Sequence, residues 1–458
     1  MKALASFVGL GVCLGVGFSA GMLGSIAPAF ADDGLPPAPP SMDPEDAVNP
    51  VSIITGSGIK VGEGTIFQPQ VGIETGVVSN VFYQQSSPVT AGLLRILAEV
   101  GTGSLPSQRL DIHATGSDQD ANTPQTFTTP NPGDFQYSAN LYASWDQYLS
   151  ADNNVTSQGG LGGGLLLRGI VNPQRPLQFA FQENFNRIIR ATNFESRSDT
   201  NRDVNDLSLR LNYVPSGRAL SGYAYYENTI DVFEASSQQF ANRLHNLLGL
   251  RVNWQWLPLT RVFADVSEGF FTGIGNSQKV NSFPFTAIGG IQTALTLNTT
   301  INAHAGYTNG FYASGPNYAG LTAGVLAGYR YSPLGRVTAL YNYVHEDSIN
   351  ANFYRDHQFQ VSVEQYFVPF ILFAQPELRL RQYVGTIVPG TTGNTRDDLI
   401  VGATVGVRYL FRDWLVGTLD YELSAIQTDF RYAVAVGAMT VDPSYVRQEL
   451  LVGVRAAY

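Results

Sequence analysis

Apolar and polar residues alternate along most of this chain. In residues 135–147, FQYSANLYASWDQ, aromatic or aliphatic side chains occupy every second position, and mostly Gln, Ser, Asn and Asp stand between them. Residues 398–411, DLIVGATVGVRYLF, are split in the same way. Because successive side chains of a β-strand point to opposite faces, the pattern predicts strands that have one apolar and one polar face.

The lengths of the connections indicate which class of protein these strands build. Soluble β-sandwiches also contain alternating strands, but from Val204 onward short turns alternate here with long polar loops. We expect short turns at 214–218, 257–258, 299–300, 332–335, 368–369 and 412–413, and long loops at 229–241, 272–283, 309–317, 347–355, 385–395 and 428–443. Short turns on one rim and long loops on the other are typical of transmembrane β-barrels. The prediction is an all-β fold, a single transmembrane antiparallel β-barrel with short periplasmic turns and long extracellular loops.

The number of strands follows from the position of the two ends. Alternating runs from Phe67 onward number about nineteen, but an even number is needed if both ends lie on the short-turn rim. The weakest run, Arg109 to Ala114, lies in a stretch rich in Gly, Pro and Thr, and we leave it out. About 18 strands remain, with 16 or 20 as alternatives. Residues 101–134 are then a periplasmic excursion or a pore-restricting segment.

Aromatic residues cluster beside the short turns, as expected at the boundary between lipid tails and headgroups. The expected aromatic girdle comprises Tyr213, Trp254, Trp256, Tyr329, Tyr331, Phe367, Phe370, Tyr409, Phe411, Trp414 and Tyr458. Alternation continues to the final residue in LLVGVRAAY, residues 450–458. We expect this last strand to close the barrel against the first, so that every second side chain from Leu450 to Tyr458 faces lipid or its interface.

The beginning of the chain predicts its destination. Lys2 precedes an apolar, Gly-rich run, and Ala29-Phe30-Ala31 matches an A-x-A cleavage site, so residues 1–31 are expected to be a signal peptide. Residues 32–64 begin as an acidic, Pro-rich stretch and are expected to form a disordered periplasmic leader, with the barrel at 65–458. Together with the barrel, this predicts the outer membrane of a Gram-negative bacterium. The chain has a net charge of −10 and contains no run of basic residues. It therefore offers few positive charges to the phosphates of a nucleic acid.

Charged residues at the inward positions predict a polar interior. By strand parity these are Arg210, Arg251, Arg261, Asp265, Arg330, Arg336, Glu346, Glu364, Glu377, Arg379, Arg381, Arg408, Asp420, Glu422, Arg447, Glu449 and Arg455. A barrel of about 18 strands is too wide for its own side chains to fill, so its interior should hold water or a folded-in loop. Each of these charges alone could simply neutralise a neighbour across the wall. The nearly even mixture of signs favours neutral polar solutes or a sugar polymer over one sign of ion.

Motifs of enzymes are weak in this chain. Residues 17–21, GFSAG, match G-x-S-x-G but lie in the expected signal peptide, without the strand and helix that such a nucleophile needs. Residues 160–164, GLGGG, resemble a phosphate-binding loop but continue into an apolar run that reads as strand. The histidines show no H-x-x-x-H pair, and Cys13, the only cysteine, lies in the expected signal peptide. We expect no enzyme activity, no cofactor and no metal.

The opening strand carries a resemblance to a known family. Residues 71–85, VGIETGVVSNVFYQQ, with Ser79-Asn80-Val81-Phe82 as the local motif, are similar to the first strand of porin-like outer-membrane β-barrels that are associated with exopolysaccharide secretion loci. The resemblance implies insertion by the barrel assembly machinery and a role as an exit pore, with periplasmic polysaccharide-export proteins as partners beside outer-membrane lipid. One departure is the end of the chain, where Tyr458 follows Val454 and Ala456 in place of aromatic residues.

Three functions follow for this barrel. The first is a passive exit pore for exopolysaccharide or another polar polymer, which combines the polar interior with the resemblance. The alternatives are a general diffusion porin for small polar solutes and a structural outer-membrane anchor, or motility or adhesion component, whose long loops hold a partner.

Overall fold

The computed structural model describes residues 58–62, 64–104, 133–173, 175–189, 201–215, 219–332, 334–349, 351–367, 369–386, 395–433 and 440–458. The chain divides into two units, residues 1–33 and 34–458, and all the described residues lie in the second. The expected signal peptide and most of residues 101–134 therefore lie outside the described residues. None of the described helices is long and apolar enough to cross a membrane.

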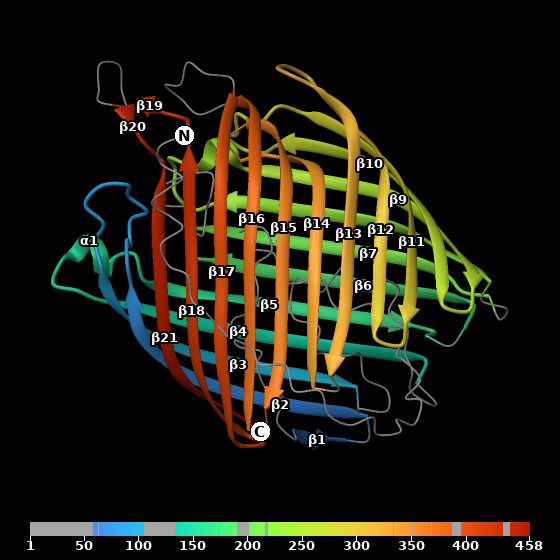
Figure 1. Cartoon of the computed structure of the whole chain (residues 1–458), viewed down its shortest axis with the longest axis horizontal. Coiled ribbons are helices and arrows are strands. Elements are labelled where there is room, and N and C mark those ends of the chain that lie inside the picture. Colours follow the sequence, from blue (N-terminus) through green and yellow to red (C-terminus); the bar gives the residue numbers. More distant parts are fainter. Residues whose placement is uncertain are drawn as a thin grey trace. The chain divides into compact units, whose positions relative to one another are not determined.

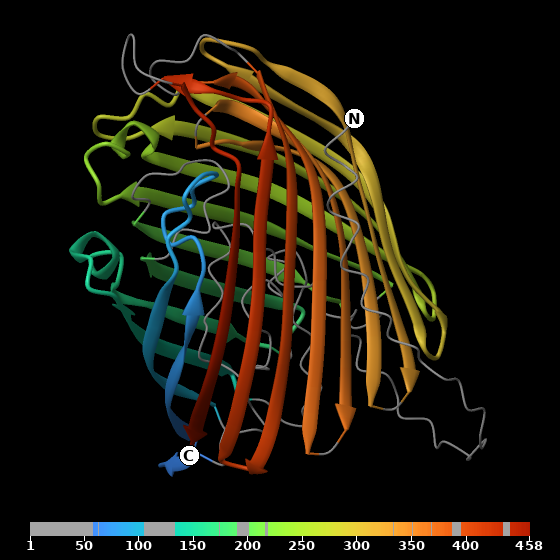
Figure 2. The same cartoon turned by 60° about the vertical axis from the view of Figure 1, so that its left-hand side comes forward.

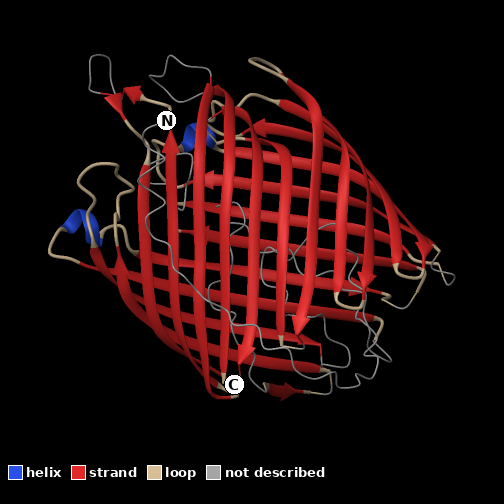
Figure 3. Ribbon diagram, in the orientation of Figure 1, coloured by secondary structure: helices blue, strands red, loops and turns tan. Residues whose placement is uncertain are grey.

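Long antiparallel strands make up almost all of the described chain (Figures 1 and 3). They are β2 (Thr65–Val78), β3 (Ala91–Ser104), β4 (Phe135–Leu149), β5 (Gly160–Val171), β6 (Leu177–Ile188), β7 (Arg202–Tyr213), β8 (Leu220–Phe233), β9 (Arg243–Leu257), β10 (Thr260–Gly273), β11 (Ser282–Thr296), β12 (Thr299–Tyr312), β13 (Tyr318–Ser332), β14 (Gly335–Asp347), β15 (Ala351–Phe367), β16 (Phe370–Thr386), β17 (Thr395–Arg412), β18 (Leu415–Thr428) and β21 (Tyr445–Ala457). The small elements are β1 (Ile59–Val61), α1 (Asn153–Thr156), the 3-10 turn η3 (Gln239–Ala241), β19 (Tyr432–Ala433) and β20 (Thr440–Val441).

Each long strand pairs with the next along the chain, and β21 returns to pair with β2. Figure 2 shows the dark red β21 beside the blue strands at the start of the barrel. In this closing pair Val71 is opposite Ala456 and Val77 is opposite Leu450. Of the 19 strands in the sheet, β1 is a three-residue addition to β2, which leaves 18 in the closed ring. The prediction of an antiparallel barrel of about 18 strands is confirmed, and the last strand closes the ring as expected.

Three details near the start of the chain differ from expectation. Residues 59–61 were expected in a disordered leader, but they form β1, which pairs with residues 65–67 of β2. The segment expected to leave the wall at residue 101 leaves it later, since β3 runs to Ser104. The motif expected within the first strand follows that strand, because β2 ends at Val78 and Asn80 has a positive φ of 53°.

The two faces of the wall differ in the way that a lipid-spanning barrel requires. The outward side chains of β21 are aliphatic and exposed, with 46% of Leu450 and 54% of Val452 accessible. The inward side chains alternate with them and include Arg447, Glu449 and Arg455, which are all less than 7% exposed. This distribution is the reverse of that in a soluble domain, which buries apolar residues and exposes charged ones. Lipid is the medium that makes such an outer face stable.

Candidate functional site: the inner wall and the mouth of the barrel

An ion network joins the strands on both sides of the closing seam. Arg95 of β3 lies at its centre, with Nε 2.8 Å from Oδ1 of Asp146 on β4. Its two Nη atoms each lie 3.4 Å from a carboxylate, those of Glu74 on β2 and Glu449 on β21. Glu74 also accepts from Arg455 of β21. Because each partner is nearly buried, every charge here depends on the others for compensation, and the network holds four adjacent strands together.

A second network follows strands β15 to β17. The carboxylate of Asp356 on β15 forms ion pairs with two arginines of β16. Its Oδ2 lies 2.8 Å from Nη2 of Arg381 and 3.5 Å from Nη1 of Arg379. The guanidinium of Arg381 also stacks 3.8 Å from the ring centre of Tyr354, a favourable cation–π arrangement. On β17, Arg396 pairs with Asp398 at 2.6 Å. Acids and bases thus neutralise each other along the inner wall, which gives that wall no strong excess of either sign in this region.

The residues expected to line the pore all occupy inward positions of their strands. Nine are buried: Arg251, Asp265, Glu377, Arg379, Arg381, Arg408, Arg447, Glu449 and Arg455. Arg210, Arg261, Glu364, Asp420 and Glu422 are partly exposed, and Arg330, Arg336 and Glu346 are exposed. That they border a conducting path stays a prediction. Several charges of the two networks were missed by the sequence analysis, although the same parity applied to β2–β4, β15 and β17 finds them: Glu74, Arg95, Asp146, Asp356, Arg396 and Asp398.

The expected aromatic girdle lies at the ends of strands beside the short connections. Trp254, Trp256 and Phe367 are each more than 50% exposed. Tyr213, Tyr329, Tyr331, Phe370, Phe411, Trp414 and Tyr458 are exposed as well, and Tyr409 is partly covered because its ring packs 4.8 Å from Phe370 and 4.7 Å from Phe411. Their contact with headgroups stays a prediction.

The β14–β15 hairpin is the largest departure from the expected loops. Residues 347–355 were expected as a long extracellular loop, but β14 continues to Asp347 and β15 starts at Ala351. β13 pairs with β14 only up to the Ala323–Tyr343 pair, although β13 begins at Tyr318 and β14 ends four residues beyond Tyr343. The tip of the hairpin therefore leaves the wall.

The contacts of the tip place it inside the barrel. His345 and Phe353 stand on the outward face of their own hairpin, yet both rings contact Tyr318, with centres 4.9 Å away in each case. Tyr318 occupies an inward position of β13, whose exposed residues, such as Leu321, have the opposite parity. The outer face of the tip can meet the inner face of β13 only if the tip has folded inward.

Asp347 fastens this folded tip to strands five places away in the ring. Its carboxylate lies 3.4 Å from Arg243 and 3.3 Å from His245, both on β9, and 3.1 Å from Lys279 in the β10–β11 connection. Only 4% of its side chain is exposed. Lys279 donates to the backbone carbonyls of Ser348 and Ala351 as well. We call Asp347, Arg243, His245 and Lys279 the tip cluster.

Apolar packing adds to the tip cluster. Ile349, at the end of the hairpin, is 1% exposed and shares a buried cluster with Phe233 and Ala241 of the β8–β9 region, against which Phe240 packs. The β12–β13 connection lies over the same tip, since Asn352 donates to the carbonyl of Ser314 at 3.0 Å. The hairpin is therefore held from several sides.

A second inward cover lies above the seam, at the same end of the barrel. Val81 from the β2–β3 connection and Val155 from α1 pack on inward residues of the wall, including Leu93 and Leu451. In the same connection, Tyr83 stacks edge-on with Tyr445, and burial raises the pKa of its hydroxyl well above the usual range. Two parts of the rim that carries the long loops thus reduce the opening that the ring of strands would otherwise leave.

The described residues contain no group of three or more His, Cys, Asp or Glu side chains that could hold a metal ion.

Comparisons with known proteins give no family for the chain. No family model matches, and no curated protein sequence matches. Solved structures that resemble the chain include OpdK from Pseudomonas aeruginosa, with 9% identity and a TM-score of 0.43 over 86% of this chain and 99% of that chain. OccK2 from the same organism has 9% identity and a TM-score of 0.42 over 85% and 97%. The iron transporter FrpB from Neisseria meningitidis has 8% identity and a TM-score of 0.44 over 87% of this chain and 82% of that chain. Likeness at this level does not extend to function.

Proposed function

We propose that the chain is an outer-membrane channel through which small polar solutes diffuse. The observation that carries this proposal is the inward β14–β15 tip, which occupies part of the mouth and is fastened by the tip cluster. A polar interior with a narrowed mouth is the construction expected of a pore that selects by size. The paired charges of the inner wall favour neutral or zwitterionic solutes over ions of one sign.

Placement in the outer membrane is part of this proposal. It is supported by the aliphatic outer face, the exposed aromatic residues beside the short turns and the expected signal peptide. As partners we propose outer-membrane lipid and the barrel assembly machinery, which would engage the strand that ends beside Tyr458. The proposal includes no catalytic step.

The exit of a polysaccharide, the first function considered from the sequence, is now the less favoured. It depended on a family resemblance for which no family model provides a match, and a hydrated polymer needs a continuously wide passage that the inward tip opposes. An anchor with a plugged lumen is the remaining alternative, because loops also cover the inner wall above the seam. Periplasmic polysaccharide-export proteins would be partners only in the polymer pathway.

Solute flux measures the difference between these functions. The purified full chain is reconstituted into liposomes, and swelling is followed in isotonic solutions of a monosaccharide, a trisaccharide and a dextran. We expect rapid entry of the monosaccharide, slower entry of the trisaccharide and exclusion of the dextran. Entry of the dextran at the rate of the monosaccharide would establish a polymer pathway. No swelling in any of the three solutions would favour the anchor. Liposomes without protein are the control.

A further inference from the structure

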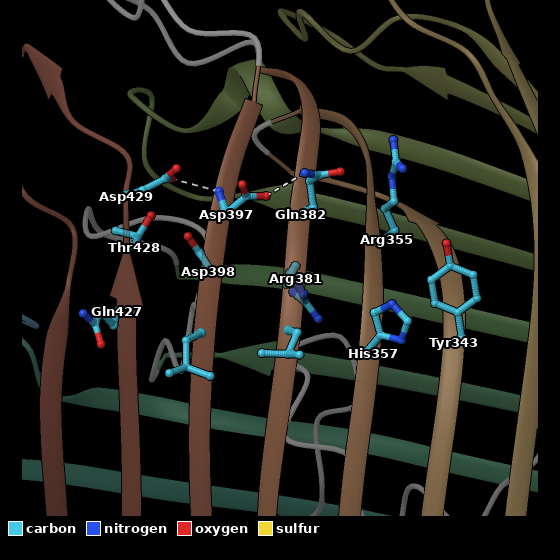
Figure 4. A pocket seen from close by; sticks show the side chains of 12 residues that line it. Tyr343, Arg355, His357, Arg381, Gln382, Asp397, Asp398, Gln427, Thr428 and Asp429 are labelled. Carbon is cyan, nitrogen blue, oxygen red and sulfur yellow. Dashed lines mark hydrogen bonds between the residues drawn. The ribbon is translucent and has the colours of Figure 1, made fainter. Parts of the chain in front are cut away.

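The outer surface of β14–β18 carries a hollow of about 680 Å³ near the extracellular ends of these strands (Figure 4). Its lower edge is a row of directly paired residues on adjacent strands. Tyr343 is opposite His357, and His357 is opposite Leu380. The row continues through Leu399 to Gln427. Below it the outward side chains are apolar and exposed, as in Phe359 and Leu378, so this row lies at the top of the lipid-facing belt.

A polar row lies one step higher on the same strands. Arg355 of β15 is opposite Gln382 of β16, which is opposite Asp397 of β17. Gln382 Nε2 donates to Oδ1 of Asp397 at 2.8 Å, and the backbone N–H of Asp397 donates to Oδ1 of Asp429 at 3.0 Å. These bonds fix the acidic end of the row before any ligand arrives. Because adjacent strands lie about 4.8 Å apart, Arg355 and the carboxylate of Asp397 stand on the order of 10 Å from each other.

One side of the hollow borders the place where the β14–β15 tip turns inward. Directly above the Tyr343–Ala323 pair, β14 parts from β13, so the outer surface recedes. Tyr343 and His357, which border the recess, stack with ring centres 4.4 Å apart and planes 25° apart. They form a flat aromatic edge beside the polar row.

The residues of the hollow define the chemistry of an occupant. Arg355 is exposed, and no carboxylate among the described residues pairs with it, so its guanidinium is available to a phosphate, the anion that its fork of donors suits well. Asp397 and Gln382 offer acceptors and donors suited to sugar hydroxyls, and the aromatic edge can cover the apolar face of a sugar ring. A molecule that binds both Arg355 and the Gln382–Asp397 pair carries a phosphate group and a sugar together. Since the apolar belt lies directly below, its acyl chains would continue along the barrel wall.

The geometry points to a binding site for the headgroup of a phosphorylated glycolipid of the outer leaflet. Phosphate binds Arg355, the sugar lies over Tyr343 and His357, and its hydroxyls reach Gln382 and Asp397. The site is on the lipid side of the wall and is separate from the path of diffusing solutes. It rests on the outer-membrane placement in the proposed function but not on conduction.

Native mass spectrometry of the full chain in detergent tests this site. The probe is lipid A, a bisphosphorylated and acylated glucosamine disaccharide, titrated against wild type, Arg355→Gln and Tyr343→Leu. The matched control is Arg187→Gln, which removes another exposed arginine, one that already pairs with Glu234 at 2.6 Å. Loss of a charged hydrogen bond costs roughly 1.5–3 kcal/mol, so we expect the affinity of Arg355→Gln to fall by about tenfold or more. Tyr343→Leu should also weaken binding, and the control should bind as wild type does.

Three outcomes would overturn the inference. The first is equal affinity in Arg355→Gln, Tyr343→Leu and wild type. The second is equal affinity for phosphatidylglycerol and lipid A, which would make the site a general anionic-lipid site without sugar recognition. The third is displacement of lipid A by equimolar inorganic phosphate, which would assign the site to the free anion. Sugar flux through each variant in liposomes separates this failure from failure of the proposed channel, because flux needs no occupied hollow.

Discussion

Neutralising Asp347 should release the tip of the β14–β15 hairpin. Asp347→Asn keeps the size of the side chain but removes the negative charge from among Arg243, His245 and Lys279, whose side chains are 2%, 17% and 4% exposed. Lys279 then loses its ion pair in a nearly buried place, whereas Arg243 keeps its pair with Asp231 at 3.1 Å. Removing one partner of a buried ion pair costs about 3–5 kcal/mol.

That cost applies only to the folded-in state of the tip, because a released tip exposes the same groups to water. Each 1.4 kcal/mol is a factor of ten in an equilibrium, so the ratio of folded-in to released tips should fall by roughly a hundredfold to several thousandfold. Packing of Ile349 and the hydrogen bond from Lys279 to Ala351 still favour the folded-in state. We therefore expect frequent exchange between two conductance levels, with the added level higher than that of wild type.

Single-channel recording in planar bilayers measures both levels directly. Glu346→Gln is the matched control, since it neutralises the neighbouring carboxylate, which binds the hydroxyl of Tyr354 and not the tip cluster. The control should show one level, without the added higher level. If Asp347→Asn shows one level identical to that of wild type, or if both variants show the added level equally, the tip does not narrow the mouth and the reasoning is refuted.

Other parts of the barrel give further expected outcomes. Arg95→Ala should lower the free energy of unfolding by about 3–5 kcal/mol, since it removes a buried guanidinium that Glu74, Asp146 and Glu449 share. Arg330→Ala at an exposed position should change the same free energy by less than about 0.5 kcal/mol. Urea titrations in micelles compare the two variants, and equal losses would show that the network does not stabilise the barrel. Leu450→Arg should lower the same free energy by about 2–4 kcal/mol in lipid vesicles, and a loss near zero would mean that this face does not meet lipid. Phe240→Cys with Ile349→Cys should form a disulfide on oxidation, seen as a band shift that reductant reverses, and failure in the folded protein would place the tip elsewhere.

The barrel was predictable because its signal is repeated in every strand. Alternation fixes which residues face lipid, so the closing position of β21 and the exposure of Leu450 followed from sequence alone. The short connections were located within a few residues because turn residues and aromatic residues mark them together. A repeated local rule of this kind does not depend on contacts between distant parts of the chain.

The inward tip was not predictable for the opposite reason. Residues 347–355 contain Asp, Ser, Asn and Arg, which read as a solvent-exposed loop. The partners that make a buried Asp347 acceptable, Arg243 and Lys279, lie far away in sequence and meet it only after the barrel has closed. The hollow on the outer surface was missed for the same reason, since one of its sides borders the place where β14 parts from β13.

The bend in the β14–β15 hairpin links the mouth of the barrel to its outer surface. The inward turn that narrows the mouth also makes the outer surface recede beside Tyr343, so a released tip should disturb the hollow without any change to the residues that line it. Asp347→Asn should therefore bind lipid A more weakly than Glu346→Gln does. Because coupling between two equilibria is reciprocal, lipid A should in turn favour the folded-in tip. Channels of Asp347→Asn should then have shorter dwell times at the higher conductance level. Recordings of that variant in bilayers with and without lipid A test this. Unchanged dwell times, with normal binding by Asp347→Asn, would show that the hollow and the mouth are independent features of the wall.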